Sequence, residues 1–171
     1  MIKHITFSIS ITFISWIVGM IINAFLIKTA FYQEKLTKLN FIRSRKLNKL
    51  IGIGVIKWVI KNTFFKLFNP KLKMKSKVDQ KELNILRNEM TVAEINHLIA
   101  FLAVVIFALV MVFKEKYLLA LVMMIVNMLM NLYPSLLQQE NKRRLAQLEK
   151  VLNRKQPGSF ATEVKSTSSA V

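Results

Sequence analysis

Three long stretches of the chain are almost wholly apolar, and most charged residues lie between and after them. The first stretch, 5–27, is long enough to cross a hydrocarbon core of ~30 Å as a helix that rises ~1.5 Å per residue. The second and third stretches, 98–113 and 117–137, are separated by a three-residue charged loop, 114–116. Because helices joined by so short a loop pack antiparallel, the pattern predicts a membrane hairpin.

The first stretch admits two interpretations, a membrane anchor or a cleaved signal peptide. Lys3 precedes it, as a basic residue precedes the apolar core of a signal peptide. The run is longer, however, than the ~7 to 15 residues of a usual signal-peptide core, and no small-x-small cleavage site follows it. We therefore expect an uncleaved anchor.

The segment between the first and second stretches is strongly basic, with sixteen Lys or Arg and only three acidic residues in 28–87. Within residues 50–68, apolar side chains alternate irregularly with lysines, and Pro70 ends this run. The pattern is typical of an amphipathic segment that lies in the membrane interface, or of a shallow re-entrant segment. Its lysines either reach from a lipid-facing anchor toward water or help to grip a substrate.

The sequence as a whole predicts an all-α membrane protein with about three transmembrane helices and a basic amphipathic interfacial segment. An amphipathic helical extension should continue after the hairpin until Pro157 and Gly158 stop it. The remaining residues are rich in Ser, Thr and Ala, and we expect them to be disordered. The predicted regions are an N-terminal transmembrane anchor (1–27), a basic cytoplasmic or interfacial region (28–96), a transmembrane hairpin with a basic amphipathic extension (97–156) and a disordered tail (157–171).

The composition favours a membrane protein over a soluble or nucleic-acid-binding one. Of the 171 residues, 53% are hydrophobic, and the mean hydropathy is +0.38 although 26 Lys and Arg give a formal charge of +17. A soluble domain of this size rarely combines these values. A basic chain also fits a nucleic-acid partner, but three long uncharged segments and the lack of an RNA-binding-sheet signature argue against one. We therefore expect no nucleic acid among its partners.

The distribution of basic residues predicts the orientation in the membrane. One Lys precedes the first helix and two lie in the hairpin loop, whereas sixteen lie in the middle block and three follow the last helix, at 142–144. Because basic residues concentrate on the cytoplasmic side, the middle block and the C-terminus should be cytoplasmic, with the N-terminus and the loop outside. The sequence thus predicts a multi-pass protein of the bacterial inner (cytoplasmic) membrane.

Ionisable and polar residues gather at the start of the hairpin, near the predicted cytoplasmic edge of the membrane. Glu94 and His97 are three residues apart and share a helix face. Folding the hairpin about Glu115 brings four residues of the third stretch to their depth: Asn131, Tyr133, Ser135 and Gln138. Ionisable groups at membrane depth usually serve function, and a His beside a carboxylate often acts as a general base. The alternative is that Glu94 and His97 only cap the helix in water at the headgroup level.

The asparagines of the third stretch have a structural alternative of their own. Asn127 and Asn131 are four residues apart, and Asn often forms hydrogen bonds between membrane helices. Other site chemistries are poorly supported, because the chain has two histidines, no Cys, no HExxH motif and no Gly-rich phosphate loop. We expect no metal and no cofactor.

Two motifs flank the hairpin, an E-x-x-x-A-E-x-x-H segment that starts at Glu89 and an N-x-x-x-N-x-x-P segment that starts at Asn127. With the basic segment that follows them, these residues resemble the glycosyl diaponeurosporenoate acyltransferase (CrtO) family over roughly residues 31–145. The matching positions are Glu89, Ala93, Glu94, His97, Asn127, Asn131, Pro134, Gln138, Asn141, Arg144 and Leu145. The sequence departs from the family pattern at Gln139, where the family has Arg, at Glu140, where it has Tyr, and at Lys142, where it has Arg.

The resemblance implies acyl transfer at a membrane, because the first named members of the family esterify the sugar of a glycosylated carotenoid with a fatty acyl chain. The substrates would be an acyl thioester donor and a hydroxyl of a lipophilic glycoside. In this interpretation His97 is the general base and Glu94 orients it. The remaining roles are oxyanion or substrate binding for Asn131, Gln138, Asn127 and Glu89, and binding of the donor's phosphates for Arg144, Arg143 and Lys142.

A second hypothesis comes from a different class of protein. The chain would be a non-catalytic membrane subunit or a lipid-binding scaffold, in which the same polar residues hold helices together or seat a lipid headgroup. Its small size and the lack of an unmistakable nucleophile motif favour this hypothesis. Its partners would then be membrane lipids and other membrane proteins.

Overall fold

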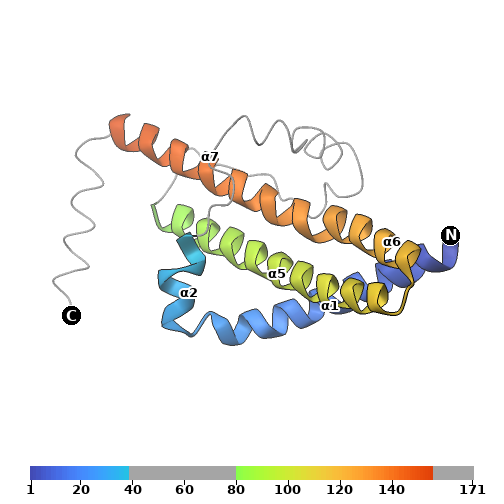
Figure 1. The fold of residues 1–171 in the computed structure, drawn as a ribbon. Helices are drawn as coiled ribbons and strands as arrows, with labels where there is room; N and C mark the ends of the chain where they lie inside the picture. The colour runs from blue at the N-terminus through green and yellow to red at the C-terminus, as the bar shows by residue number, and fades with distance from the viewer. Residues whose placement is uncertain (39–79, 156–171) are drawn as a thin grey trace.

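The computed structural model describes residues 1–38 and 80–155, and every regular element in these two ranges is helical (Figure 1). The elements are, in order, α1 (Ile2–Leu26), α2 (Ala30–Glu34), the 3-10 turn η1 (Leu36–Lys38), α5 (Gln80–Phe113), α6 (Tyr117–Asn127), the π-helical turn η3 (Met128–Leu132) and α7 (Tyr133–Lys155). The predicted all-α architecture is confirmed for these ranges. The predicted interfacial segment, 50–68, and the predicted disordered tail, 157–171, lie outside them.

Three helical segments are long and apolar enough to cross a membrane: Ile2–Leu26, Lys81–Phe113 and Tyr117–Val151. The prediction of about three transmembrane helices, two of them in a hairpin, is therefore confirmed. Helix α1 starts at the hairpin end of the bundle and runs antiparallel to α5, which in turn is antiparallel to the continuous α6–η3–α7 helix (Figure 1). The N-terminus and the 114–116 loop thus lie at the same end of the molecule.

Helix α5 begins well before the apolar run that predicted it. Its 34 residues would span about 51 Å at ~1.5 Å per residue, which exceeds the ~30 Å hydrocarbon core. Its first turns therefore project beyond the core, where Arg87 forms an ion pair with Glu149 of α7. The predicted boundary after residue 96 falls inside this continuous helix.

Helix α1 exposes its large apolar side chains and buries its small and polar ones, which is the reverse of an amphipathic helix in a soluble protein. Large apolar side chains are exposed around it, including Ile2 at 81% and Phe25 at 70%, as expected for a helix that faces lipid. Its buried residues are small or polar and recur on one face: Ser8, Thr12, Ser15, Gly19 and Asn23. Small residues of this kind let membrane helices approach closely, and this face packs on α5 and α6.

Two apolar clusters bound a polar layer inside the bundle. The cluster toward the hairpin consists of Val104, Ala108 and Met123. The cluster toward the opposite end consists of Leu83, Met90 and Leu145. The buried polar side chains of α5, α6, η3 and α7 include Glu94, Asn127, Asn131, Ser135 and Gln139. Their positions along the helices place most of them between the two clusters, so the polar groups form a layer within the membrane-spanning part.

The π-helical turn η3 interrupts the third membrane-spanning helix just before Pro134. Pro134 has no N–H and cannot donate to the carbonyl four residues earlier. The N–H of Tyr133 reaches back five residues to the carbonyl of Met128, which is the π-helical pattern. Such a turn rotates the residues that follow it relative to those before it. It therefore sets which side chains of α7 face α5.

Candidate active site

Glu94 on α5 is fully buried and is held by two residues of α7. Its carboxylate accepts a hydrogen bond from Gln139 Nε2 at 2.7 Å and forms an ion pair with Lys142 Nζ, whose side chain is only 14% exposed. A carboxylate in a membrane interior is costly unless it is paired and hydrogen-bonded. These contacts compensate the charge of Glu94 and join α5 to α7.

His97, one helical turn after Glu94, contacts a different set of residues. Its Nδ1 lies 3.4 Å from Oδ1 of Asn131. Asn131 Nδ2 donates to Oδ1 of Asn127 at 2.9 Å, and Asn127 Nδ2 donates to the backbone carbonyl of Phe101 at 3.0 Å. We call this chain of contacts from His97 through Asn131 and Asn127 to the Phe101 carbonyl the amide relay. It starts and ends on α5 and crosses to the third membrane-spanning helix between.

Trp16 of α1 covers one face of the His97 ring. The two rings are stacked, with centroids 5.5 Å apart and an interplanar angle of 15°. The imidazole is therefore fixed at one edge by Asn131 and on one face by Trp16. Counted from Phe113 at the hairpin end, His97 lies ~24 Å along α5, just inside the far edge of a ~30 Å core.

A close contact between α1 and α5 brings Trp16 into place. A Cβ atom on Gly19 would lie 2.6 Å from the backbone oxygen of Asn96, so only glycine fits here without a shift. One turn later, Asn23 Nδ2 donates to Asn96 Oδ1 at 2.6 Å and to the carbonyl of Val92 at 3.2 Å. These amide contacts fix the height of α1 against α5.

Tyr32 of α2 is buried near the same end of the site, at 4% exposure. Thr29 caps α2 by accepting a hydrogen bond from the Tyr32 N–H at 3.2 Å, which fixes the backbone from which this side chain projects. Burial raises the pKa of the Tyr32 hydroxyl above its ordinary value; interaction with Asn23 opposes this and the charge of Glu94 adds to it. Tyr32 is thus electrostatically connected to the polar layer.

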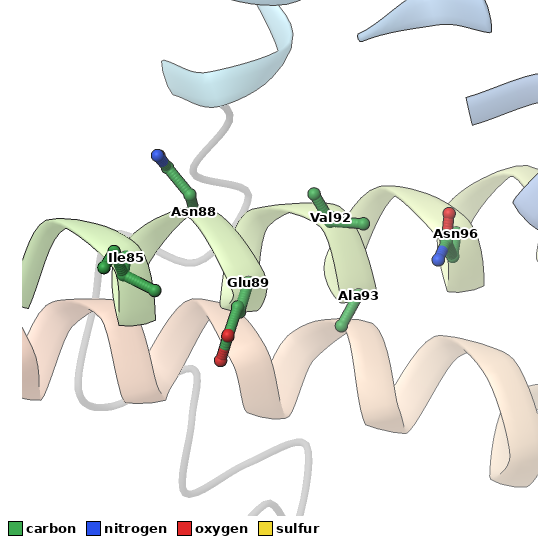
Figure 2. A pocket seen from close by; sticks show the side chains of 6 residues that line it. All are labelled: Ile85, Asn88, Glu89, Val92, Ala93 and Asn96. Atoms are coloured by element: carbon green, nitrogen blue, oxygen red, sulfur yellow. The ribbon is translucent and has the colours of Figure 1, made fainter. Parts of the chain in front are cut away.

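A cavity of about 420 Å³ opens along α5, beside the polar layer (Figure 2). Its lining residues are Ile85, Asn88, Glu89, Val92, Ala93 and Asn96. The lining combines apolar side chains with a carboxylate and two amides, which is the mixture that an amphiphilic ligand requires. Asn96 belongs both to this cavity and to the contact with α1, so the cavity adjoins the site around His97.

The three basic residues expected to bind phosphates differ in their surroundings. Lys142 pairs with Glu94, as described above. Arg143 and Arg144 both form ion pairs with Glu140, and the Arg144 side chain remains 63% exposed whereas that of Arg143 is 25% exposed. Of the three, Arg144 is therefore the most accessible to solvent.

The structure brings most of the predicted site residues together, but with different partners from those expected. Glu94 contacts Gln139 and Lys142, whereas the hydrogen-bonding partner of His97 is Asn131. Glu89 lines the cavity, and Gln138 lies half-buried on α7. A π turn fits an extra residue into the helix, and Gln139 and Lys142, which follow it, come later in the chain than a simple fold about Glu115 predicts for partners of Glu94.

Several residues of the site were not singled out from the sequence, chiefly Trp16, Asn23, Asn96 and Tyr32. Trp16 and Asn23 lie in the first apolar stretch. The sequence signal that could have identified Asn23 is a polar amide within a membrane helix, where such residues often form hydrogen bonds to other helices. Gln139 was noted only as a departure from the family pattern. Two of the three departures, Gln139 and Lys142, turn out to be the residues that hold Glu94.

A comparison with protein families gives a match for the greater part of the chain. The family model of glycosyl-4,4'-diaponeurosporenoate acyltransferase (CrtO) matches residues 28–151, which include all the site residues except those of α1. The comparisons with curated proteins and with solved structures give no match. The matched range covers most of the chain and contains both flanking motifs and the hairpin between them. The chain therefore belongs to the glycosyl-4,4'-diaponeurosporenoate acyltransferase family.

Proposed function

We propose that this protein is a membrane acyltransferase that moves a fatty acyl group from a thioester donor to a hydroxyl of a lipophilic, carotenoid glycoside-like acceptor. Family membership supports the reaction class. Three membrane-spanning helices with a buried polar layer support an acceptor that is itself embedded in the membrane.

One observation carries the assignment of the base. His97 lies within the membrane-spanning part, fixed at its Nδ1 edge by Asn131 and on its face by Trp16, and no described residue forms a hydrogen bond with its Nε2. An imidazole that is held on two sides presents its remaining nitrogen in one direction. This is the arrangement that a general base requires.

The proposed reaction uses that nitrogen twice. Nε2 of His97 takes the proton of the acceptor hydroxyl while the oxygen attacks the thioester carbonyl, giving a tetrahedral oxyanion. The intermediate then collapses, the C–S bond breaks, and the imidazolium returns its proton to the leaving thiolate. The products are the acylated glycoside and the free thiol, with no net change in His97.

The contacts refine the other proposed roles. Asn131 is buried and already donates to Asn127, whereas Gln138 is half-buried, so we assign the donor of a hydrogen bond to the oxyanion to Gln138 rather than to Asn131. Glu94 pairs with Lys142 and Gln139, and we assign it to holding α7 against α5 rather than to orienting His97. Arg144, with its exposed side chain, is the proposed contact for the donor's phosphates.

We place the acceptor's sugar in the cavity along α5, where Asn88 and Glu89 offer hydrogen bonds to hydroxyls beside apolar side chains. The N-terminus and the hairpin loop would face outward and the opposite end would face the cytoplasm, since the basic residues concentrate there. The site would then lie at the cytoplasmic edge of the inner membrane, where a soluble thioester donor can reach it.

The test is the substitution His97→Gln, with His4→Gln as its matched control, because these are the two histidines of the chain and His4 lies at the hairpin end. Acylated and unacylated glycolipid or pigment in membranes would be measured by mass spectrometry. His97→Gln should lower turnover by about a hundredfold or more, since glutamine cannot accept the proton, while His4→Gln should leave it unchanged. Wild-type acylation by His97→Gln would show that His97 is not the base.

A non-catalytic scaffold is the second candidate, and one observation favours it. Many of the buried polar side chains of the layer, including Glu94 and both relay asparagines, connect helices to one another. In that case His97→Gln would preserve function, whereas Asn131→Leu would weaken assembly by about 1 kcal/mol, the scale of a hydrogen bond between membrane helices.

A further inference from the structure

Each amide of the relay donates in one direction only, and the Phe101 carbonyl at the end of the relay determines which direction this is. The backbone carbonyl of Phe101 can only accept a hydrogen bond, so the atom of Asn127 that faces it at 3.0 Å must be the nitrogen Nδ2. The oxygen of Asn127 then faces Asn131, which must present its own nitrogen at 2.9 Å. The oxygen of Asn131 is left to face the His97 ring.

This polarity has a consequence for His97. An amide oxygen cannot donate, so the ring nitrogen opposite it, Nδ1, must carry a hydrogen. The distance of 3.4 Å from His97 Nδ1 to Asn131 Oδ1 is longer than the two hydrogen bonds made by Asn131 and Asn127. The contact is therefore weak, and its effect is to favour a hydrogen on Nδ1. In a neutral imidazole with a proton on Nδ1, Nε2 has none and offers a lone pair.

We propose that the amide relay positions His97 by fixing its ring as the Nδ1–H tautomer, which leaves Nε2 as the proton acceptor. Asn131 and Asn127 are thus positioning residues, and the Phe101 carbonyl is the fixed point of the relay. Many enzymes use a carboxylate for this purpose. Here Glu94 is engaged with Lys142 and Gln139, and a neutral chain of amides does the same without a further buried charge.

Trp16 contributes to the same arrangement from the other side of the ring. Stacking on the indole at 5.5 Å restricts rotation of the imidazole about its χ2 angle, which would otherwise turn Nδ1 away from Asn131. Trp16 belongs to α1, which lies outside the range matched by the family model. The first helix is therefore part of the site in this inference, and not only an anchor.

The inference rests on the proposed role of His97, but its test does not need activity. Protein labelled in both ring nitrogens of histidine would be examined by NMR in detergent or lipid, in a His4→Gln background so that only His97 contributes. Nitrogen resonances distinguish a protonated ring nitrogen from an unprotonated one. We expect a proton on Nδ1 and none on Nε2 in the neutral ring. A proton on Nε2 instead overturns the relay.

Variants separate positioning from general packing. Asn131→Leu should move the proton from Nδ1 toward Nε2 and lower kcat about tenfold or more with little change in KM, because the wrong tautomer cannot act as the base. Asn131→Asp keeps an acceptor opposite Nδ1 and should keep the Nδ1–H tautomer. Arg87→Met, the control, removes an ion pair between α5 and α7 that lies away from the His97 ring and should leave the tautomer unchanged. A tautomer that is the same in all three variants overturns the inference.

Failure of the inference and failure of the proposed function give different results. A wild-type ring with its proton on Nδ1, together with full activity of His97→Gln, would support the relay and show that His97 is not the general base. A ring with its proton on Nε2, together with loss of activity in His97→Gln, would support His97 as the base and overturn the relay.

Discussion

Glu94 of α5 and Lys142 of α7 form an ion pair within the membrane-spanning part of the bundle, with the carboxylate fully buried and the lysine 14% exposed. The two residues come from opposite sides of the hairpin, 48 positions apart in the numbering of the chain. Removing one member of a buried pair leaves the other without its counter-charge, which costs more than the pair itself contributes.

We therefore expect Lys142→Met to destabilise the protein by about 3–5 kcal/mol, measured as the free energy of unfolding in a detergent titration. The double variant Glu94→Gln with Lys142→Met should recover most of this loss, because no charge then remains buried. Arg144→Met is the control, since its side chain is largely exposed. Equal effects of Lys142→Met and Arg144→Met would mean that the pair makes no stabilising contribution.

Because α1 lies so close to α5, we expect one added methyl group at position 19 to destabilise the protein strongly. Gly19→Ala would place a Cβ atom 2.6 Å from the Asn96 oxygen and 3.3 Å from the Ala100 nitrogen, both of them backbone atoms. Helix α1 must then move outward, at a cost of about 1–3 kcal/mol. Trp16 would move with it, so acylation should fall as well.

The control for this prediction is Val18→Ala on the adjacent, exposed position of α1. It changes the lipid-facing surface and leaves the contact with α5 intact. If Gly19→Ala unfolds at the same detergent concentration as Val18→Ala, the two helices are not packed as closely as described.

The raised pKa of Tyr32 predicts a specific dependence of stability on alkaline pH. Because burial makes the folded chain keep this proton longer than the unfolded chain does, stability is fully retained below the ordinary pKa of tyrosine and falls as pH rises above it. Tyr32→Phe removes the ionisable group, so part of this alkaline loss should disappear.

The measurement is an ultraviolet titration of tyrosinate formation, followed by unfolding at increasing pH. Tyr32→Phe should remove a late-ionising component, whereas Tyr117→Phe, at a position that is 63% exposed, is the control and should leave that component in place. A late-ionising component that persists in Tyr32→Phe would contradict the assignment.

The orientation can be tested directly because the chain contains no cysteine. Lys116→Cys at the hairpin and Lys150→Cys near the opposite end of the bundle both introduce a thiol at an exposed position. With the proposed orientation, a membrane-impermeant maleimide labels Lys116→Cys in intact cells and Lys150→Cys only after permeabilisation. The reverse pattern would put the site on the wrong side for a cytoplasmic thioester.

Much of the architecture was predictable because long apolar runs leave a chain few choices in a membrane. The membrane-spanning helix over 5–27 and the hairpin around 114–116 both follow from length, hydropathy and a short loop, and the structure contains them. The motifs around Glu94 and Asn127 also predicted the family, since they are local and can be read without a fold. The start of α5 at Gln80 was not predictable from hydropathy, because its first turns project from the membrane and are polar.

The sequence by itself determined which segments cross the membrane and which polar residues lie at similar depth. Only the tertiary structure decided which of them touch, because contact depends on how each helix is rotated about its axis, and a helix that is apolar all round carries little signal for that rotation. Gln139 and Lys142, which follow the π turn on α7, meet Glu94, whereas Asn131, within the turn, meets His97. Because Gly19 has no side chain, α1 lies so close to α5 that Trp16 reaches the His97 ring. These two residues are 81 positions apart in sequence, and only the close approach of the two backbones brings them together.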